Sequence, residues 1–145
     1  MSAYADSSFL VSLYTMDANS PRAARVMART SLPVLITLLG ELELTNALQL
    51  RVFRKELEVS EVKTGLAWFR RDLATGIFAT KPISARTYER AKQIARKHTA
   101  QLGTRTFDVM HVASALLSQA DILYTFDGRQ GKLAKAEGLS APILV

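Results

Sequence analysis

The stretch that decides the fold is AYADSSFLVSLY, residues 3–14. Its first three residues favour a short buried strand, and the aspartate and serine pair that follow favour the start of a helix carrying the apolar run to residue 14. The same strand-to-helix pattern returns at residues 34–56 and at 122–137. Strands that alternate with helices without hairpin signals predict an α/β protein with a mostly parallel central sheet, covered by helices on both faces.

The segments between these units complete the expected order of elements. Ser20 and Pro21 are typical of a helix start, Ser60 and Thr106 are candidate helix caps, and Gly76 favours a helix end. The further helices are predicted at 22–29, 60–74, 84–100 and 107–119, and the further strands at 77–80 and 143–145. No internal repeat or linker interrupts the pattern, so residues 1–145 are expected to form one domain.

The composition excludes several classes of protein. Hydrophobic residues make up 48% of the 145 residues and charged residues 22%, which is typical of a globular domain and not of a disordered or fibrous chain. Because there is no cysteine, disulfides, zinc–thiolate sites, iron–sulfur clusters and thiol nucleophiles are excluded. The longest apolar run, residues 32–39, is far shorter than the roughly 20 residues of a membrane helix. We therefore expect no signal peptide, no membrane partner and a cytoplasmic location.

Three aspartates occupy positions typical of ligand sites in α/β proteins. Asp6 and Asp127 each follow a predicted strand, and parallel strands bring their carboxyl ends to one edge of the sheet. Asp108 lies in the first turn of a helix that is apolar on almost every side. A buried carboxylate needs a partner, so Asp108 is interpreted either as part of the same site or as a helix cap.

A fourth acid is expected from the helix that begins near residue 38. Glu41 and Glu43 both lie in it, inside an apolar stretch. Residues two positions apart do not share a face of a helix, so only one of the two is expected to be functional. The residues alone do not decide which one.

Clustered carboxylates repel one another, and a divalent cation is the usual means of stabilising such a cluster. With no cysteine and with His98 and His111 at unhelpful spacing, an all-oxygen Mg²⁺ site, or a Mn²⁺ site, is favoured over zinc or copper. The 19 basic and 13 acidic residues give a net charge of +6, which favours a polyanionic substrate without proving one. Metal-assisted cleavage of a phosphodiester is therefore the predicted chemistry.

The order of these features resembles the PIN-domain family, and more closely the VapC-type toxins of bacterial toxin–antitoxin pairs. The resemblance spans nearly the whole chain, and its anchors are YADSS (4–8), ELELTNAL (41–48), RTFDVMHVA (105–113) and TFD (125–127). It implies a compact α/β/α fold, a magnesium site, endonucleolytic cleavage of RNA by a metal-activated water, and inhibition by a cognate VapB-like antitoxin. A homodimer is also expected.

Carried over residue by residue, the family's acids fall on Asp6, Asp108 and Asp127, with Glu43 as the fourth and Glu41 as the alternative. Ser7 and Thr125 match hydroxyl positions beside the metal, and Arg105 is a supporting residue next to the substrate path. Two other hypotheses remain open: a PIN-like module that binds RNA or protein without cleaving, and a phosphotransferase that uses Asp6 as the acceptor. His111 is interpreted as a histidine hydrogen-bonded within the fold.

Overall fold

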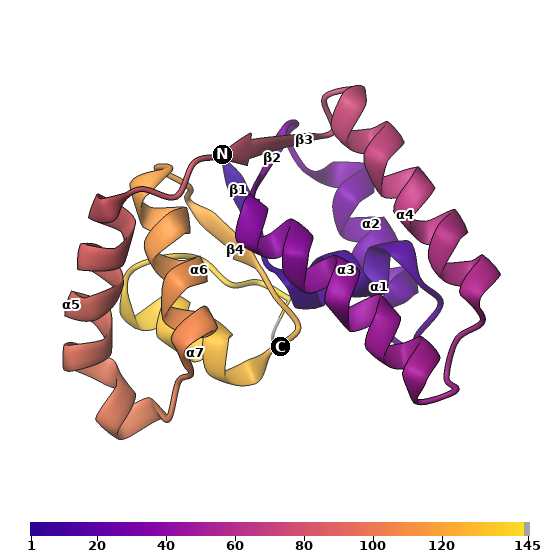
Figure 1. The fold of residues 1–145 in the computed structure, drawn as a ribbon. Coiled ribbons are helices and arrows are strands. Elements are labelled where there is room, and N and C mark those ends of the chain that lie inside the picture. The colour runs from indigo at the N-terminus through magenta and orange to yellow at the C-terminus, as the bar shows by residue number, and fades with distance from the viewer. Residues whose placement is uncertain (144–145) are drawn as a thin grey trace.

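The computed structural model describes residues 1–143 and contains four strands and seven helices in that range. The predicted α/β class is confirmed, and Figure 1 shows the arrangement. In chain order the elements are β1 (Ala3–Ala5), α1 (Ser7–Tyr14), α2 (Ser20–Arg29), β2 (Val34–Thr37), α3 (Leu38–Phe53), α4 (Val59–Ala74), β3 (Phe78–Lys81), α5 (Ala85–Leu102), α6 (Thr106–Leu117), β4 (Ile122–Tyr124) and α7 (Gly128–Ala136).

The four strands form one sheet in the order β3-β2-β1-β4, and every pairing is parallel. Tyr4 of β1 pairs with Leu35 on one side and with Leu123 on the other. The two central strands, β1 and β2, are buried on both faces, which explains why they read as nearly continuous apolar runs. Edge strand β3 is exposed toward its carboxyl end. The carboxyl ends of all four strands therefore lie at the same edge of the sheet.

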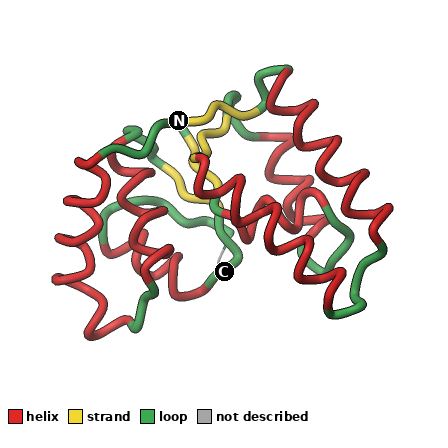
Figure 2. Tube along the Cα trace, in the orientation of Figure 1, coloured by secondary structure: helices red, strands yellow, loops and turns green. Residues whose placement is uncertain are grey.

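Alternate strand residues pack into two cores, one on each face of the sheet. Ala3, Ala5, Val34 and Ile36 face a core that includes residues of α1, α3 and α4, and α2 also packs against α1. Tyr4, Leu35 and Leu123 face the second core, with residues of α5, α6 and α7. Figures 1 and 2 show the two helical layers on either side of the strands. The predicted three-layer arrangement is thus confirmed.

Several predicted boundaries are wrong in detail. The N-cap of α4 is Glu58 rather than Ser60, and that of α6 is Arg105 rather than Thr106. The helix predicted to reach residue 56 ends at Phe53. Of the strand predicted at 143–145, residues 144–145 lie outside the described residues and Ile143 lies in a turn, while Ser140 makes the bridge to Ile122 instead. Over residues 1–143, no helix is long and apolar enough to cross a membrane.

The crossing of α4 over the end of α1 depends on Gly65. A Cβ atom at this position would lie 2.5 Å from the backbone oxygen of Tyr14, which is too close for any side chain. We expect Gly65→Ala to destabilise the fold by about 1–3 kcal/mol, because α4 has to move away from α1. Gly128→Ala is the control, since a Cβ there meets nothing within 4 Å. Equal midpoints in urea unfolding for both variants would contradict this account.

Candidate active site

The predicted site residues gather at the carboxyl ends of the neighbouring strands β1 and β4. The chain leaves β1 toward one face of the sheet and leaves β4 toward the other, and ligand sites in parallel sheets form at such points. Asp6 directly follows β1, and its backbone N–H donates to the carbonyl of Tyr124 at the end of β4 over 3.1 Å. Asp127 follows β4 after two intervening residues. Each aspartate is also an N-cap, Asp6 of α1 and Asp127 of α7. Strand ends and helix starts thus bring the two carboxylates to one place.

Asp6 is buried and receives four hydrogen bonds. Its Oδ1 accepts from the backbone N–H of Phe9 at 2.9 Å and from the hydroxyl of Ser8 at 2.7 Å. Its Oδ2 accepts from the hydroxyl of Thr125 and from Nε2 of Gln130, the latter at 2.6 Å. Burial raises the pKa of the Asp6 carboxyl, and nearby His111 and the hydrogen bonds counteract part of that shift. These four donors hold the buried Asp6 carboxylate in one orientation.

Asp108 and Asp127 are both held by backbone donors at helix starts. Oδ2 of Asp108 accepts from the backbone N–H of Arg105 at 2.8 Å, so the capping interpretation is correct, yet the same side chain also lines the cleft. Oδ1 of Asp127 accepts from the backbone N–H groups of Arg129 and Gln130 at 2.9 and 3.3 Å. The Arg105 guanidinium is 3.9 Å from the other oxygen of Asp127, and its side chain is 75% exposed. Arg105 therefore stands at the mouth of the cleft.

The two glutamates of α3 point to different places. Glu43 reaches the cleft and contacts Nε2 of His111. Glu41 turns toward the edge strand β3, where Oε2 is 3.4 Å from the hydroxyl of Thr80. Of the two, only Glu43 lines the cleft with the three aspartates. Its partner His111 is buried and hydrogen-bonded within the fold, as interpreted from the sequence.

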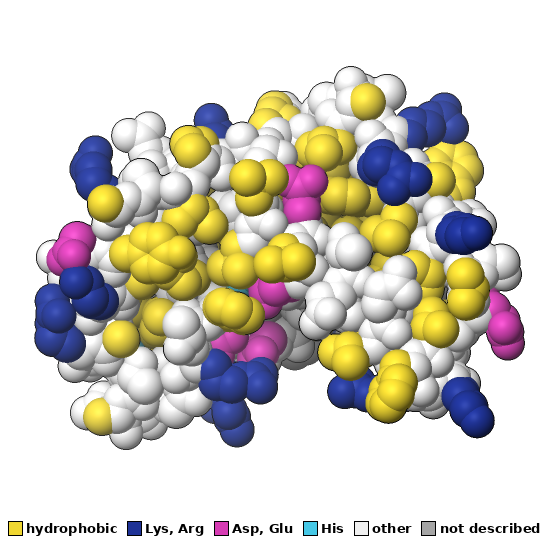
Figure 3. All heavy atoms as spheres, viewed as in Figure 1, with side chains coloured by type: hydrophobic (Ala, Val, Ile, Leu, Met, Phe, Trp, Pro, Cys, Tyr) yellow, Lys and Arg dark blue, Asp and Glu magenta, His cyan; other side chains and the backbone are white. Residues whose placement is uncertain are grey.

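All four predicted acids line one cleft of about 400 Å³. Its full lining is Asp6, Ser7, Ser8, Glu43, Arg105, Thr106, Phe107, Asp108, His111, Asp127 and Gln130. Figure 3 shows acidic side chains near the middle of this face with basic side chains beside them. Within residues 1–143, however, no three His, Asp or Glu side chains come close enough together to form a ready-made metal site. The acids share a cleft while each is held by donors of the chain itself.

The donor chemistry of this cleft fits a hard divalent cation. The four acidic side chains offer carboxylate oxygens alone, which are the ligands that Mg²⁺ and Mn²⁺ prefer. Glu43 and Asp127 remain partly exposed, with side-chain exposures of 20% and 28%. The buried charge of Asp6 is one that a neighbouring cation would stabilise, because its raised pKa reflects lost solvation.

Sequence reasoning missed two contributors to the site, Ser8 and Gln130. Ser8, rather than the predicted Ser7, hydrogen-bonds to Asp6, while both serines line the cleft. Gln130 is buried and contacts Asp6, and its only sequence signal is its position one helical turn after the N-cap Asp127. Thr125 was predicted, and it contacts Asp6 and accepts from the backbone N–H of Asp127 at 3.0 Å.

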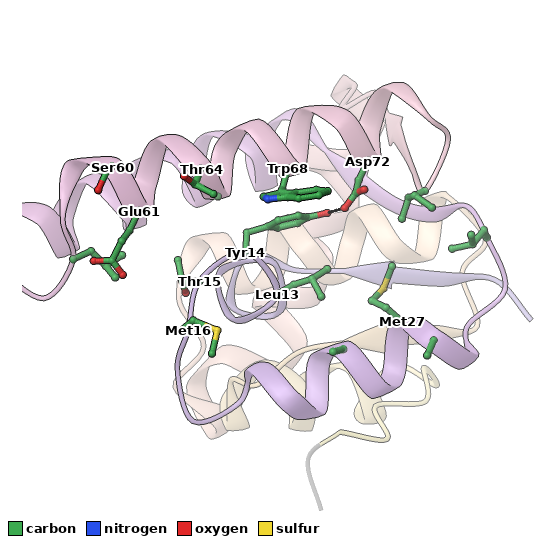
Figure 4. Close-up of a pocket in the computed structure, with 16 residues that line it drawn as sticks. Leu13, Tyr14, Thr15, Met16, Met27, Ser60, Glu61, Thr64, Trp68 and Asp72 are labelled. Carbon is green, nitrogen blue, oxygen red and sulfur yellow. Dashed lines mark hydrogen bonds between the residues drawn. The ribbon is translucent and has the colours of Figure 1, made fainter.

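A second and larger cavity, of about 810 Å³, lies away from the acids between α1, α2 and α4. We call it the apolar groove. Figure 4 shows Leu13, Met16, Met27 and Trp68 around it, with Tyr14 and Asp72 joined by a hydrogen bond of 2.6 Å. Trp68 is the single tryptophan of the chain and is 52% exposed. The guanidinium carbon of Arg71 lies 5.0 Å from the centroid of the Trp68 ring.

Comparison with known proteins adds to this geometry. The chain matches the family model of the PIN domain over residues 3–136. Similar solved structures include the sarcin–ricin loop cleaving toxin VapC20 of Mycobacterium tuberculosis, with a TM-score of 0.74, 19% identity, and coverage of 97% of this chain and 98% of that one. A toxin–antitoxin complex from Klebsiella pneumoniae gives a TM-score of 0.68, 19% identity, and coverage of 97% and 98%.

A third similar structure is PAE2754 of Pyrobaculum aerophilum, with a TM-score of 0.59, 16% identity, and coverage of 97% of this chain and 89% of that one. No curated protein matches the sequence. At these identities the solved structures establish a shared fold.

Proposed function

This chain belongs to the PIN-domain family, and from that premise we propose that it is a metal-dependent endoribonuclease acting as the toxin of a toxin–antitoxin pair. The observation that carries the proposal is the convergence of Asp6, Glu43, Asp108 and Asp127 on one cleft at the carboxyl ends of the strands. The net charge of +6 favours a polyanionic substrate. The similar fold of VapC20, described as a toxin that cleaves the sarcin–ricin loop, supports RNA as that substrate.

In this proposal the four acids hold Mg²⁺ or Mn²⁺. When bound, such an ion lowers the pKa of a water and offsets charge on the leaving oxygen of a phosphodiester. The chain itself supplies orientation. Thr125 and Gln130 fix the Asp6 carboxylate, and the exposed guanidinium of Arg105 is placed at the mouth of the cleft to contact a phosphate.

Removal of divalent cations tests this function directly. We expect the purified protein to cut RNA internally in Mg²⁺ or Mn²⁺, to stop when the ions are chelated, and to resume when they are added back. Gel analysis of a 5′-labelled RNA separates internal cuts from stepwise shortening. RNA that is bound but stays intact with either ion would instead support a non-catalytic PIN-like module.

The proposed partner is a VapB-like antitoxin, and the apolar groove is the surface that fits one of its segments. The groove is lined by apolar side chains such as Leu13 and Met27, while the exposed arginines Arg25, Arg29 and Arg70 lie on its two flanking helices α2 and α4. An amphipathic segment with an apolar face and acidic residues complements such a surface. The Klebsiella pneumoniae complex, as a toxin bound to an antitoxin on a similar fold, supports the pairing.

Trp68 makes this docking measurable. We expect its fluorescence to shift to shorter wavelength when a purified VapB-like antitoxin is added, because docking removes the indole from water. Ala28→Glu places a carboxylate in the groove and should weaken binding at least tenfold without changing RNA cleavage. Lys92→Glu, on the exposed face of α5, is the control. If Ala28→Glu bound the antitoxin as tightly as wild type, the apolar groove would not be the antitoxin site.

Two further expectations belong to the same proposal. We expect a homodimer, so light scattering on the purified protein should give about twice the 16.0 kDa mass of one chain. An RNA-cleaving toxin acts in the cytoplasm, where its substrate is. Both remain predictions.

A further inference from the structure

Three side chains from distant parts of the sequence form a buried chain of contacts that ends at the cleft. The hydroxyl of Tyr4, on β1, lies 2.7 Å from Nδ1 of His111, on α6. Nε2 of the same ring contacts Oε1 of Glu43, on α3. Tyr4 and His111 are fully buried, while Glu43 reaches the surface of the cleft. The contacts therefore link the middle of the sheet to one of the four acids.

The donors and acceptors in these contacts determine where the hydrogens of Tyr4 and His111 lie. A carboxylate only accepts hydrogen bonds. In the contact between His111 and Glu43, the hydrogen is therefore on Nε2 of His111 and points to Glu43. Burial raises the pKa of the Tyr4 phenol, so its hydroxyl keeps its hydrogen. That hydrogen is directed to Nδ1 when the ring is neutral, or to Thr37, 3.3 Å away, when the ring carries both hydrogens. In both cases Nε2–H faces Glu43.

Glu43 differs from the other three acids in how it is anchored. Asp6, Asp108 and Asp127 each accept a backbone N–H at the start of a helix. Glu43 lies at the sixth residue of α3, where the backbone N–H groups are already used by the helix. A glutamate also has one more side-chain torsion than an aspartate to fix. His111 supplies from another helix the donor that α3 does not offer.

We propose that His111 is a positioning residue that holds the Glu43 carboxylate over the cleft, with Tyr4 holding the histidine ring. This inference rests on the proposed function in one respect, namely that Glu43 takes part in holding the divalent cation. The contact between His111 and Glu43 does not depend on it. Removing a donor that orients a metal-binding carboxylate usually weakens metal affinity or activity by about 10–100-fold.

The experiment compares three variants by calorimetric titration with Mn²⁺ alone and by RNA cleavage. His111→Gln keeps an amide N–H near the position of Nε2, whereas His111→Met fills similar space without a donor. His98→Met is the matched control, because His98 also contacts a glutamate through Nε2, at 2.7 Å from Glu137, but outside the cleft. We expect about 10–100-fold weaker Mn²⁺ binding and lower kcat with unchanged KM for His111→Met. In His111→Gln, the Mn²⁺ affinity and kcat should lie within about tenfold of wild type. In His98→Met, both should be unchanged.

A double-mutant cycle shows whether His111 acts through Glu43. If it does, His111→Met has little further effect on Mn²⁺ affinity once Glu43 is already glutamine. Additive effects would mean that His111 only supports the fold, and the proposal would be overturned. If His111→Met does not fold, Tyr4→Phe is used in the same cycle, because it removes one hydroxyl and keeps the ring.

A spectroscopic measurement separates this proposal from the proposed function. The ¹⁵N shifts of the His111 ring in the metal-free protein should show the hydrogen on Nε2, and they should change in Glu43→Gln but not in Glu41→Gln. A ring with hydrogen on Nδ1 alone would overturn the positioning role even if the enzyme cuts RNA. Conversely, the expected shifts in a protein that never cuts RNA would leave the contact established and remove only the nuclease.

Discussion

Asp6→Asn is expected to lower the rate of RNA cleavage by about 10³-fold while the protein stays folded. Loss of a carboxylate from a metal site removes several kcal/mol of charge stabilisation, and each 1.4 kcal/mol is about tenfold in rate. The fold should tolerate the change, because the asparagine oxygen can still accept from Phe9 and Ser8, and the Gln130 amide can turn its oxygen toward the new amide N–H. Single-turnover cleavage of a labelled RNA and thermal unfolding measure the two effects.

The same substitution carries a prediction about stability. Because burial raises the pKa of Asp6, its ionised form is less favourable in the folded protein than in the unfolded chain at neutral pH. Asparagine has no charge, so Asp6→Asn should unfold at the same or a higher temperature than wild type. The control is Asp121→Asn, an exposed aspartate at the opposite end of β4 that accepts from the backbone N–H of Ser2. Equal cleavage by wild type and Asp6→Asn would rule out the proposed site.

The positions of Asp6 and Asp127 were predictable because short-range patterns determine them. Each lies between an apolar strand and a helix start, and a parallel sheet brings both to one edge. Asp108 was predictable for a related reason, since a carboxylate in the first turn of an apolar helix needs a partner. Local sequence therefore identified three acids before any tertiary contact was known.

The remaining parts of the site depend on contacts between segments far apart in the sequence. Gln130 reaches Asp6 across 124 residues, and His111 reaches Glu43 across 68. Such contacts follow from how α6 and α7 pack on the sheet, which no local pattern specifies. The same limit applies to helix starts. Ser60 is a good cap by residue type, but the reciprocal bonds between Glu58 and Glu61 start α4 two residues earlier.

Glu43→Gln should reduce cleavage by about 10³-fold, whereas Glu41→Gln should leave it unchanged. The two glutamates are an unusually close pair of test and control, because they lie two residues apart on α3 and are both half-buried. They differ in direction: Glu43 lines the cleft beside His111, and Glu41 turns toward Thr80. Since each change removes one negative charge, a general effect of net charge on RNA binding would appear in both variants. Parallel cleavage assays and Mn²⁺ titrations compare them. If Glu41→Gln lost cleavage and Glu43→Gln kept it, Glu41 would be the fourth acid of the site. The proposed role of His111 in positioning Glu43 for metal binding would then be wrong.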